Sequence, residues 1–327
     1  MAATALVTGA TGFVGAALVR RLAADGVAVR VLVRPSSDTA AVEGSTVAVV
    51  RGDLTDPGVA ARAVSGADVV YHLAARNDLG APDAAEMRRA NVEITRVVLT
   101  AAARAGAVAV HCSSIAALGP TPGAGLAGEA HWSESVVPVE YARSKREAHL
   151  VARSLAAGGA RVRIASPGGV YGAGDHSPLV DMMARVVNGV PLGYVPRNRQ
   201  SFVHVDDCAD ALVRVGGSGV DGREYVVVAD AVTFREFWTM LAHVAGRRRP
   251  LLVPAWMVQA GAHAAPLLSA ISGLDAAYVH DAAAMIRWDS AYSGRRLRDE
   301  LGWSPRSLAD GLGDVVTWLR DRQRGGD

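Results

Sequence analysis

The chain has 327 residues, half of them hydrophobic and only 5% aromatic, and its formal net charge at pH 7 is +2. This length is enough for a large α/β unit, or for a main domain with a smaller partner domain. The small net charge argues against a nucleic-acid or membrane-surface partner. The two cysteines, Cys112 and Cys208, lie in apolar patterns, so we expect no disulfide framework, no metal site, and a reducing, cytoplasmic location.

The first two-thirds of the chain alternate short Val-rich runs with amphipathic stretches. We expect strands at residues 5–8, 28–33, 46–51, 68–73, 108–113, 162–166 and 225–228. We expect helices at residues 13–24, 58–63, 86–105, 139–156 and 204–216. Continuous apolar strands separated by helices predict an α/β fold with a doubly wound parallel sheet of the Rossmann type. The ligand crevice of such a fold lies at the carboxyl ends of the strands.

The alternation weakens after Gly172, where residues 173–199 and everything after residue 230 show a mixed helix and loop pattern. We therefore predict two domains: a dinucleotide-binding domain, and a smaller, mostly helical substrate-binding lobe. Their predicted limits are residues 1–172 plus 204–230 for the first, and residues 173–203 plus 231–327 for the second. Residues 119–138 form a long Gly/Pro-rich stretch, typical of a lid or a binding loop.

The most apolar stretch is residues 251–274. Two prolines, a glutamine and a histidine interrupt it, whereas a membrane-spanning helix needs about 20 mainly apolar residues in a row. We interpret it as helices of the substrate-binding lobe, with peripheral membrane contact as the alternative, and predict no integral membrane segment. The strand expected at residues 5–8 leaves no room for a signal peptide before it.

The segment TGATGFVG, residues 8–15, follows the first expected strand and opens the first expected helix. Gly9, Gly12 and Gly15 permit a tight turn, a close approach of the backbone to a pyrophosphate, and close packing of the helix on the strand. The helix N-terminus adds unpaired N–H donors and the positive end of its dipole. A glycine triplet alone is a weak signal, but in this strand–turn–helix context it predicts a dinucleotide site.

The end of the second expected strand bears on the choice between NAD and NADP. A site that prefers NAD places an acidic residue there to accept a hydrogen bond from the ribose, whereas this chain has Arg34. A guanidinium matches the 2′-phosphate of NADP, so we expect NADP, with NAD and a simple surface arginine as the alternatives. Asp53, after the third strand, is expected to contact the adenine, and Asp56 to cap a helix.

Tyr141 and Lys145 are four residues apart on one expected helix, so their side chains share a face. A free phenol has a pKa near 10, and a nearby ammonium, together with the positive ring of an oxidised nicotinamide, favours the phenolate. Lys145 is the only lysine in a chain that otherwise uses arginine, and a guanidinium cannot replace a compact ammonium. We therefore predict that Tyr141 transfers a proton and that Lys145 tunes it.

Ser113 and Ser114 end the fifth expected strand, at the edge of the sheet where the crevice is predicted. A hydroxyl there can hold the substrate oxygen that exchanges a proton with Tyr141. Asn91 lies early in the long helix after the fourth strand. We expect it either to organise a water or the backbone near Lys145, or simply to cap a neighbouring loop.

These residues together resemble the extended short-chain dehydrogenase/reductase family, also called the NAD-dependent epimerase/dehydratase group, over almost the whole chain. The resemblance rests on TGATGFVG at 8–15, RGDLTD at 51–56, YHLAA at 71–75, NVEIT at 91–95, SSIAALG at 113–119, YARSK at 141–145, PGGVYGAGD at 167–175, FVHVDD at 202–207 and LGWSP at 301–305. It implies that Tyr141 is the acid/base and that Lys145 is its partner and a ligand of the ribose. Ser114, five residues before Gly119, is implied as the serine that orients the substrate. The implied cofactor site also includes Thr11, Phe13, Val14, Leu54, Leu73, Ala74, Ala75, Pro167, Gly168 and Val170.

Departures from the sugar-nucleotide members of the family favour a different substrate. Gly169 and Gln200 stand where UDP-sugar 4-epimerases carry an asparagine and an arginine, and residues 115–116 lack the Asp-Glu pair of sugar 4,6-dehydratases. The chain is more similar to the branch of 3β-hydroxysteroid dehydrogenases, dihydroflavonol reductases and hopanoid-associated enzymes, which act on lipophilic alcohols and ketones. We expect an apolar pocket. Its candidate lining residues, unless they belong to the core, are Trp132, Met182, Met183 and Tyr194.

Three functions are consistent with these patterns. The first is an NAD(P)-dependent oxidoreductase that moves a hydride between NADP(H) and a secondary alcohol or ketone of a bulky, mostly apolar small molecule. The second is an NDP-sugar epimerase with tightly bound NAD. The third is a cofactor-sensing regulatory protein, a class that usually loses the tyrosine–lysine pair. The resemblance also implies a homodimer formed through the helices expected at residues 86–105 and 139–156.

Overall fold

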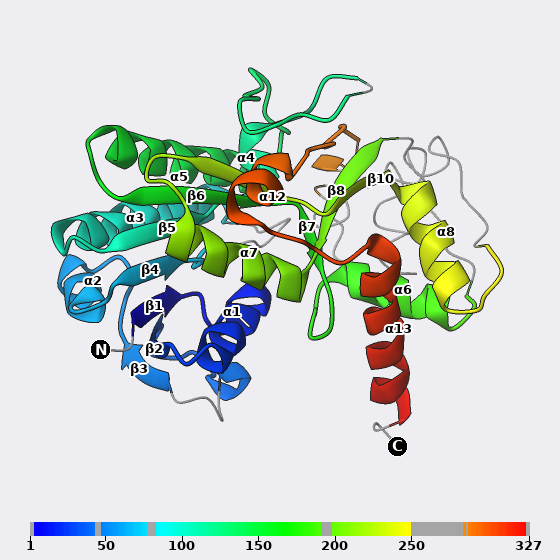
Figure 1. Ribbon diagram of the computed structural model, residues 1–327, viewed down its shortest axis with the longest axis horizontal. Coiled ribbons are helices and arrows are strands. Elements are labelled where there is room, and N and C mark those ends of the chain that lie inside the picture. Colours follow the sequence, from blue (N-terminus) through cyan, green and yellow to red (C-terminus); the bar gives the residue numbers. More distant parts are fainter. Residues whose placement is uncertain are drawn as a thin grey trace.

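A seven-stranded parallel sheet forms the centre of the larger part of the molecule (Figure 1). Its strand order is β3-β2-β1-β4-β5-β6-β9, and every neighbouring pair is parallel. The strands are β1 Thr4–Thr8, β2 Ala28–Val33, β3 Val47–Arg51, β4 Val69–His72, β5 Val108–Cys112, β6 Val162–Pro167 and β9 Glu224–Val227. All seven predicted strands are confirmed to within one residue at either end. The computed structural model describes residues 3–42, 47–76, 83–123, 125–190, 198–249, 281, 284–285 and 287–324.

The strand order reverses between β1 and β4, because the chain builds outward from β1 to β3 on one side and from β4 to β9 on the other. In open α/β sheets, ligands bind outside the carboxyl ends of the strands at such a reversal. The fold therefore places the expected crevice beside the carboxyl ends of β1 and β4.

Helices cover both faces of this sheet, because successive strand residues point to opposite sides. Val7 packs with the helices of one face, and Leu6 packs with those of the other; both side chains are fully buried. The helices of the first face are α1 Phe13–Ala24 and α7 Val205–Ser218, and those of the second are α2 Pro57–Val64, α3 Ala84–Arg104 and α5 Glu140–Ala157. These five predicted helices are confirmed to within two residues at either end.

A second, three-stranded sheet has the order β10-β8-β7. Strand β7 (Gly169–Tyr171) runs parallel to β8 (Arg199–His204), and β10 (Asp230–Thr233) runs antiparallel to β8. The prediction of only helix and loop after residue 230 is therefore wrong at β10, and the predicted strands did not include β7 or β8. These strands are only three to six residues long and pair across long sequence separations, so they leave no regular pattern.

Aromatic rings and three helices form a separate core around this small sheet. Phe202 of β8 stacks on Phe237 with ring centroids 4.5 Å apart, and Tyr171 of β7 meets Phe237 edge-on at 6.1 Å. The covering helices are α6 Pro178–Val187, α8 Phe234–Val244 and α13 Leu308–Arg324, which lie together on the right of Figure 1. The fold is thus a doubly wound parallel sheet with a smaller region of mixed sheet and helix.

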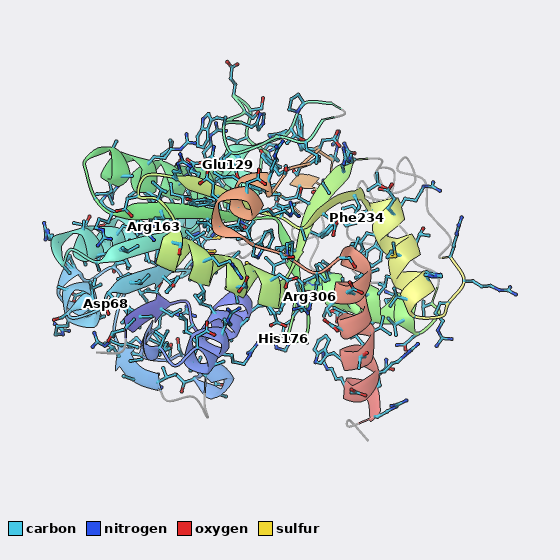
Figure 2. The ribbon with its side chains drawn as sticks, viewed as in Figure 1. Asp68, Glu129, Arg163, His176, Phe234 and Arg306 are labelled. Atoms are coloured by element: carbon cyan, nitrogen blue, oxygen red, sulfur yellow. The ribbon has the colours of Figure 1, made fainter. Side chains whose placement is uncertain are left out.

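Arg306 connects the two parts of the molecule (Figure 2). Its Nε donates to a carboxylate oxygen of Asp207 in α7 over 3.0 Å, and its Nη1 donates to Asp314 in α13 over 2.6 Å. The remaining short helices of the described residues are a 3₁₀ turn at Ala40–Val42, α4 Ile115–Leu118 and α12 Arg295–Leu301.

Within the described ranges, no helix combines the length and the apolar character that crossing a membrane requires. The apolar stretch 251–274, with its expected helices, lies outside the described residues.

Candidate active site

The glycine turn joins β1 to α1 at the reversal of the strand order. Gly9 has a φ of +72°, and a Cβ there would lie 2.7 Å from the backbone nitrogen of Ala74. A Cβ on Gly15 would lie 2.0 Å from the Gly9 carbonyl oxygen, so both positions require glycine. Gly12 is exposed, and a Cβ there would meet its nearest neighbour only at 3.4 Å, so the backbone is open to an approaching group. This cradle at a helix N-terminus fits the pyrophosphate of a dinucleotide.

The chain after β4 runs alongside this turn. The Leu73 N–H donates to the Thr8 carbonyl over 3.2 Å, and the Ala74 N–H donates to the Thr8 hydroxyl over 3.3 Å. Ala75 follows and is exposed. The other residues expected at the turn lie within it or in the first turn of α1: Thr11, Phe13 and Val14.

Arg34 follows β2 at the same edge of the sheet, and its side chain is exposed. The loop that carries it is held by a second arginine: Arg51 of the neighbouring strand β3 donates to the carbonyls of Pro35 and Ser37 over 3.1 and 3.0 Å. Among the described residues, no hydrogen bond or ion pair occupies the Arg34 guanidinium. The exposed Arg34 guanidinium can therefore bind an approaching anion.

The two acidic residues after β3 have local roles. The Asp53 carboxylate accepts from the Thr55 N–H and from the Thr55 hydroxyl, each over 2.8 Å, and these bonds lower the pKa of Asp53. Asp56 caps α2, where it accepts from the N–H of Gly58 over 2.7 Å, so the predicted helix cap is confirmed. Leu54 between them is buried in the core.

Tyr141 and Lys145 lie in the first two turns of α5, and both are partly buried. Tyr141 packs in one apolar cluster with Ala116, and therefore beside α4, the short helix that Ser114 caps. The charge of Lys145 reaches the sheet: burial, and then this ammonium, lowers the pKa of His72 at the end of β4 to about 3. The tyrosine–lysine pair therefore lies close to the carboxyl ends of β4 and β5.

The two serines after β5 differ in what their hydroxyls contact. Ser113 is 3% exposed, and its Oγ lies 2.8 Å from Nδ1 of His149. Ser114 is only partly buried, and its Oγ accepts from the N–H of Ala116 over 3.2 Å. A hydroxyl that accepts from an N–H keeps its own proton for another acceptor. Of the two, Ser114 is therefore the serine that can donate to a substrate oxygen.

Asn91 is buried, and its side-chain amide contacts groups that flank the site. Its Oδ1 accepts from the Arg76 N–H over 2.8 Å, and its Nδ2 donates to the Arg76 carbonyl over 2.8 Å and to the Ser144 hydroxyl over 3.2 Å. Asn91 thus holds both a neighbouring loop and the residue next to Lys145, so the two expectations for it are not exclusive.

The chain after β6 crosses from the large sheet to the small one. A Cβ on Gly168 would lie 2.5 Å from the Ser201 carbonyl oxygen, so glycine lets β8 approach closely. Pro167 is the last residue of β6, and Val170 of β7 packs against the core of the large sheet. These predicted cofactor residues lie at the same edge of the sheet as the glycine turn.

Buried histidines that were not predicted from the sequence lie on the face of the sheet next to Lys145. His72 Nδ1 lies 2.9 Å from the Thr8 hydroxyl, and its Nε2 lies 3.1 Å from the Thr95 hydroxyl. His111 stacks on His72 with ring centroids 5.6 Å apart, and neither of its ring nitrogens has a partner among the described residues. The available signal was a histidine inside strands that otherwise consist of small apolar residues.

The residues expected to line an apolar pocket have other contacts. The guanidinium groups of Arg146 and Arg153 each lie over the ring of Trp132, 4.2 and 4.1 Å from its centroid. Met183 is 1% exposed in the core of the smaller region, and Met182 packs against that core. The core alternative therefore holds for both methionines. The fourth candidate, Tyr194, lies outside the described residues.

The long loop at residues 119–138 is fixed to a distant segment. The Tyr292 hydroxyl donates to the Gly119 carbonyl over 2.6 Å, and the Ala127 N–H donates to the Ala291 carbonyl over 2.9 Å. These bonds hold the loop against the C-terminal part of the chain.

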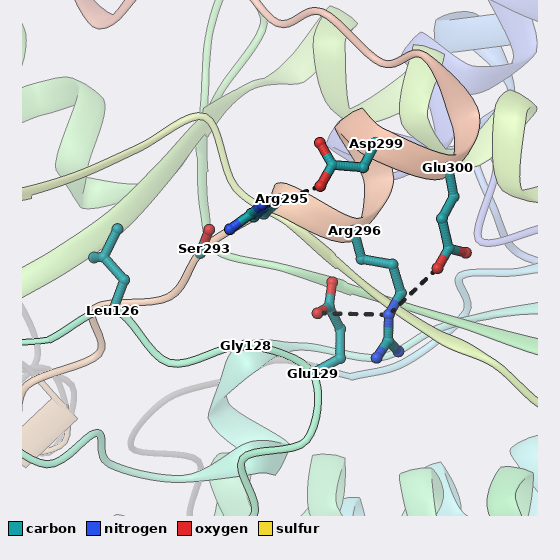
Figure 3. A pocket seen from close by; sticks show the side chains of 8 residues that line it. All are labelled: Leu126, Gly128, Glu129, Ser293, Arg295, Arg296, Asp299 and Glu300. Carbon is teal, nitrogen blue, oxygen red and sulfur yellow. Dashed lines mark hydrogen bonds and ion pairs between the residues drawn. The ribbon is translucent and has the colours of Figure 1, made fainter.

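A hollow of about 480 Å³ lies between this loop and α12 (Figure 3). In its wall, Glu129 accepts from the Val226 N–H of the edge strand β9 over 3.2 Å, and burial raises the pKa of Glu129. Arg296 lies 3.8 Å from Glu129 and 3.9 Å from Glu300, so the charges of the wall are largely paired with one another. Since β9 is the edge strand on the far side from β3, this hollow is separate from the glycine turn.

Comparison with known proteins places these features in a family. The sequence profile of the NAD dependent epimerase/dehydratase family matches residues 5–246. The chain belongs to this family. Membership makes it an NAD(P)-dependent enzyme of the extended short-chain dehydrogenase/reductase type, in agreement with the glycine turn and the tyrosine–lysine pair.

Individual relatives cover most or all of the chain. Sterol demethylase protein B of Methylococcus capsulatus is 31% identical over 98% of this chain and 99% of that protein. Ceramide reductase of Caulobacter vibrioides is 32% identical over 75% of this chain and 72% of that protein. The solved structure of a dTDP-glucose 4,6-dehydratase from Streptomyces venezuelae with NAD bound matches with a TM-score of 0.76 and 26% identity over 98% of each chain.

Proposed function

We propose that the protein moves a hydride between NADP(H) and a secondary alcohol or ketone of a bulky, mostly apolar substrate. The observation that carries this proposal is the placement of Ser114, Tyr141 and Lys145 near the sheet edge that holds the glycine turn. A bound nicotinamide supplies or accepts the hydride. The Ser114 hydroxyl donates to the substrate oxygen, Tyr141 gives that oxygen a proton or takes one, and Lys145 stabilises the phenolate and binds the ribose.

The surroundings of Tyr141 support an apolar substrate. Tyr141 packs against a cluster of apolar side chains, which are Ala116, Val136, Val137, Val139, Ala142, Ala284 and Met285. Pockets for lipophilic ligands are lined in this way, with few polar anchors. The relatives named for a sterol and for a ceramide agree with such a substrate.

NADP, in preference to NAD, is supported by Arg34. Its exposed guanidinium follows β2, where an enzyme that prefers NAD has a carboxylate, and Arg51 fixes the loop beside it. An exposed arginine in a loop whose backbone is held in place suits the 2′-phosphate. Asp53 is proposed to contact the adenine, although its carboxylate is also engaged by Thr55.

A second candidate is an NDP-sugar epimerase, which is favoured by the likeness to a dTDP-glucose 4,6-dehydratase structure. The same serine, tyrosine and lysine would serve it, but the hydride would leave and return within one turnover. A cofactor-sensing regulatory protein is a third candidate from another class. Such proteins usually lose the tyrosine–lysine pair, so its presence here argues against this candidate.

The proposal extends to the organisation of the chain. Residues 1–172 plus 204–230 would bind the dinucleotide, residues 173–203 plus 231–327 would bind the substrate, and the enzyme would act in the cytoplasm. Helices α3 and α5 pack on each other, and Leu150 of α5 is 47% exposed. We propose that the outer surface of these two helices joins two copies in a homodimer.

The test is the nicotinamide absorbance of the purified protein mixed with NADPH and a panel of steroid, long-chain and aromatic ketones. A dehydrogenase must consume NADPH in step with ketone reduction. An epimerase leaves the absorbance unchanged while it converts an NDP-sugar, and that result would replace the proposal by the second candidate.

A further inference from the structure

A hydroxyl, an imidazole and a carboxylate form a continuous buried chain next to Ser114. Ser113 Oγ lies 2.8 Å from His149 Nδ1, and His149 Nε2 lies 3.0 Å from Glu224 Oε1. Ser113 is 3% exposed, His149 0% and Glu224 9%. The three residues come from the end of β5, the middle of α5 and the start of β9, so the chain crosses from one element of the site to the far edge of the sheet.

We propose that His149 is a positioning residue that fixes the strand end carrying Ser114 relative to Tyr141 and Lys145. This inference rests on the proposed function, because it gives His149 a part in the same hydride-transfer site. Tyr141, Lys145 and His149 are spaced four residues apart, so they form one stripe along α5. The first two members of the stripe serve the reacting groups. The third holds Ser113, whose backbone continues directly into Ser114.

The charges around Ser113, His149 and Glu224 determine where the protons of these three groups lie. Burial alone would raise the pKa of the Glu224 carboxyl, but hydrogen bonds from His149 and Arg153 lower it below its usual range. The Glu224 carboxylate therefore accepts from His149 Nε2–H. Since Arg153 already balances the carboxylate charge, a neutral imidazole keeps the buried set neutral. Its Nδ1 then accepts from the Ser113 hydroxyl, whose proton is no longer available to a substrate oxygen.

The loop after α4 shields the hydrogen bonds of Ser113, His149 and Glu224 from water. Trp132 of that loop lies against His149 with ring centroids 5.4 Å apart, and Arg146 and Arg153 stack on its ring. Hydrogen bonds are stronger in such a dry, weakly polarisable environment than in water. The contact between Ser113 and His149 can therefore hold β5 and α5 in a fixed relative position.

The same three groups occur in serine hydrolases, but the arrangement here does not support hydrolysis. A hydrolase serine must be open to an acyl group. Ser113 is 3% exposed, and its N–H donates to the Ala165 carbonyl of the neighbouring strand β6 over 2.8 Å. The hydroxyl therefore points into the packed layer between the sheet and α5, where it can fix a position but cannot attack a substrate.

Two substitutions separate the two hydrogen bonds of His149. The amide of asparagine reaches about as far as Nδ1 of histidine, so His149→Asn keeps an acceptor for Ser113. The amide of glutamine reaches about as far as Nε2, so His149→Gln keeps a donor for Glu224. We expect His149→Gln to lower kcat about 100-fold, as a displacement of about 1 Å would, with KM and cofactor affinity unchanged. His149→Asn should stay within about threefold of the wild-type kcat, because the contact to Ser113 is retained.

Each variant loses one buried hydrogen bond, so a merely structural role would lower kcat and melting temperature equally in both. Tyr225→Phe is the matched control. It removes a buried hydroxyl that accepts from the Val220 N–H over 3.0 Å. Tyr225 is next to Glu224 in the sequence but does not take part in the hydrogen bonds of Ser113, His149 and Glu224. Its kcat should match the wild type. Equal kcat losses in the Asn and Gln variants, or a wild-type kcat in the folded Gln variant, would overturn the proposal.

Nitrogen NMR of the imidazoles of the whole protein at pH 7 gives a readout that needs no turnover. A neutral His149 with its proton on Nε2 supports the proposal. An imidazolium, or a proton on Nδ1, overturns it. If the wild-type protein reduces none of the ketones, the proposed function fails alone, and the position of the His149 proton still decides whether the buried chain exists as described.

Discussion

Asn91 of α3 and Ser144 of α5 are joined by a hydrogen bond of 3.2 Å from the amide to the hydroxyl. The same amide holds both the N–H and the carbonyl of Arg76, each at 2.8 Å, and the Ser144 hydroxyl donates to the Tyr141 carbonyl over 2.8 Å. Asn91 thereby ties the loop after β4 to the helical turn that carries Tyr141 and Lys145. One buried amide connects the two segments between which the cofactor and the acid/base are proposed to meet.

Asn91→Ala should lower both stability and turnover. The substitution removes the amide that accepts from the Arg76 N–H and donates to the Arg76 carbonyl and the Ser144 hydroxyl, so we expect the free energy of unfolding to fall by about 2 kcal/mol. Because the turn that carries Tyr141 and Lys145 is released, kcat should fall as well. Urea unfolding and steady-state kinetics measure the two effects. Asn188→Ala, on the exposed end of α6, is the control, and an unchanged kcat in the Asn91 variant would remove its positioning role.

Tyr141→Phe should lower kcat about 1,000-fold, because the proton donor is lost, while the Kd for NADPH stays within about twofold. Lys145→Arg should also lower kcat strongly, since a flat guanidinium does not reproduce a compact ammonium. Stopped-flow absorbance and NADPH fluorescence measure the two quantities. Arg143→Lys, on an exposed position of the same helix, should behave as wild type. A Tyr141 variant with normal turnover would exclude the proposed acid/base.

Arg34→Ala should raise the Kd for NADPH about 30-fold, equivalent to the loss of about 2 kcal/mol from a charge-assisted hydrogen bond. The Kd for NADH should not change, because only NADPH carries the 2′-phosphate. Fluorescence titration with both cofactors gives the ratio. Arg20→Ala, at an exposed position of α1, controls for the loss of a surface charge. Equal weakening of both cofactors would show that Arg34 does not read the 2′-phosphate.

The large sheet could be predicted from the sequence because each of its strands is a continuous apolar run between amphipathic helices. β8 and β10 escaped prediction because Arg199 and Asp230 lie in short, mixed segments that become strands only when they pair. Local pattern carries no information about a partner that is distant in the chain. The same limit applies to the site, where local motifs could be predicted and contacts with distant residues could not.

Tyr141, Lys145 and the glycine turn could be named from spacing alone, because each motif is local. The contact of Ser113 with His149, and of Asn91 with Ser144, joins residues 36 and 53 positions apart. Such contacts depend on how α3 and α5 pack on the sheet, and no spacing in the sequence encodes them. The distinction between Ser113 and Ser114, which rested on resemblance, gains a physical reason only from these contacts.

The buried histidines should make the fold sensitive to mild acid. His72 and His111 are 1% and 3% exposed. Burial lowers the pKa of His72 from 6.5 to about 3 and lowers that of His111 as well, and the charge of Lys145 adds to both effects. In the unfolded chain each histidine recovers a pKa of about 6.5, so as the pH falls the unfolded state binds protons first. Stability is therefore full above about pH 6.5 and falls below it, down to the folded-state pKa.

Each such histidine should cost about 1.4 kcal/mol of unfolding free energy for every pH unit below about 6.5. Urea unfolding at constant ionic strength, between pH 7 and 5, measures this slope before most carboxylates begin to titrate. His111→Phe keeps a flat ring but removes one titrating group, so its slope should be shallower than that of the wild type by about one histidine's share. Parallel slopes for the wild type and the His111 variant would mean that His111 is protonated as readily in the folded protein as in the unfolded chain, contrary to its burial beside His72 and Lys145.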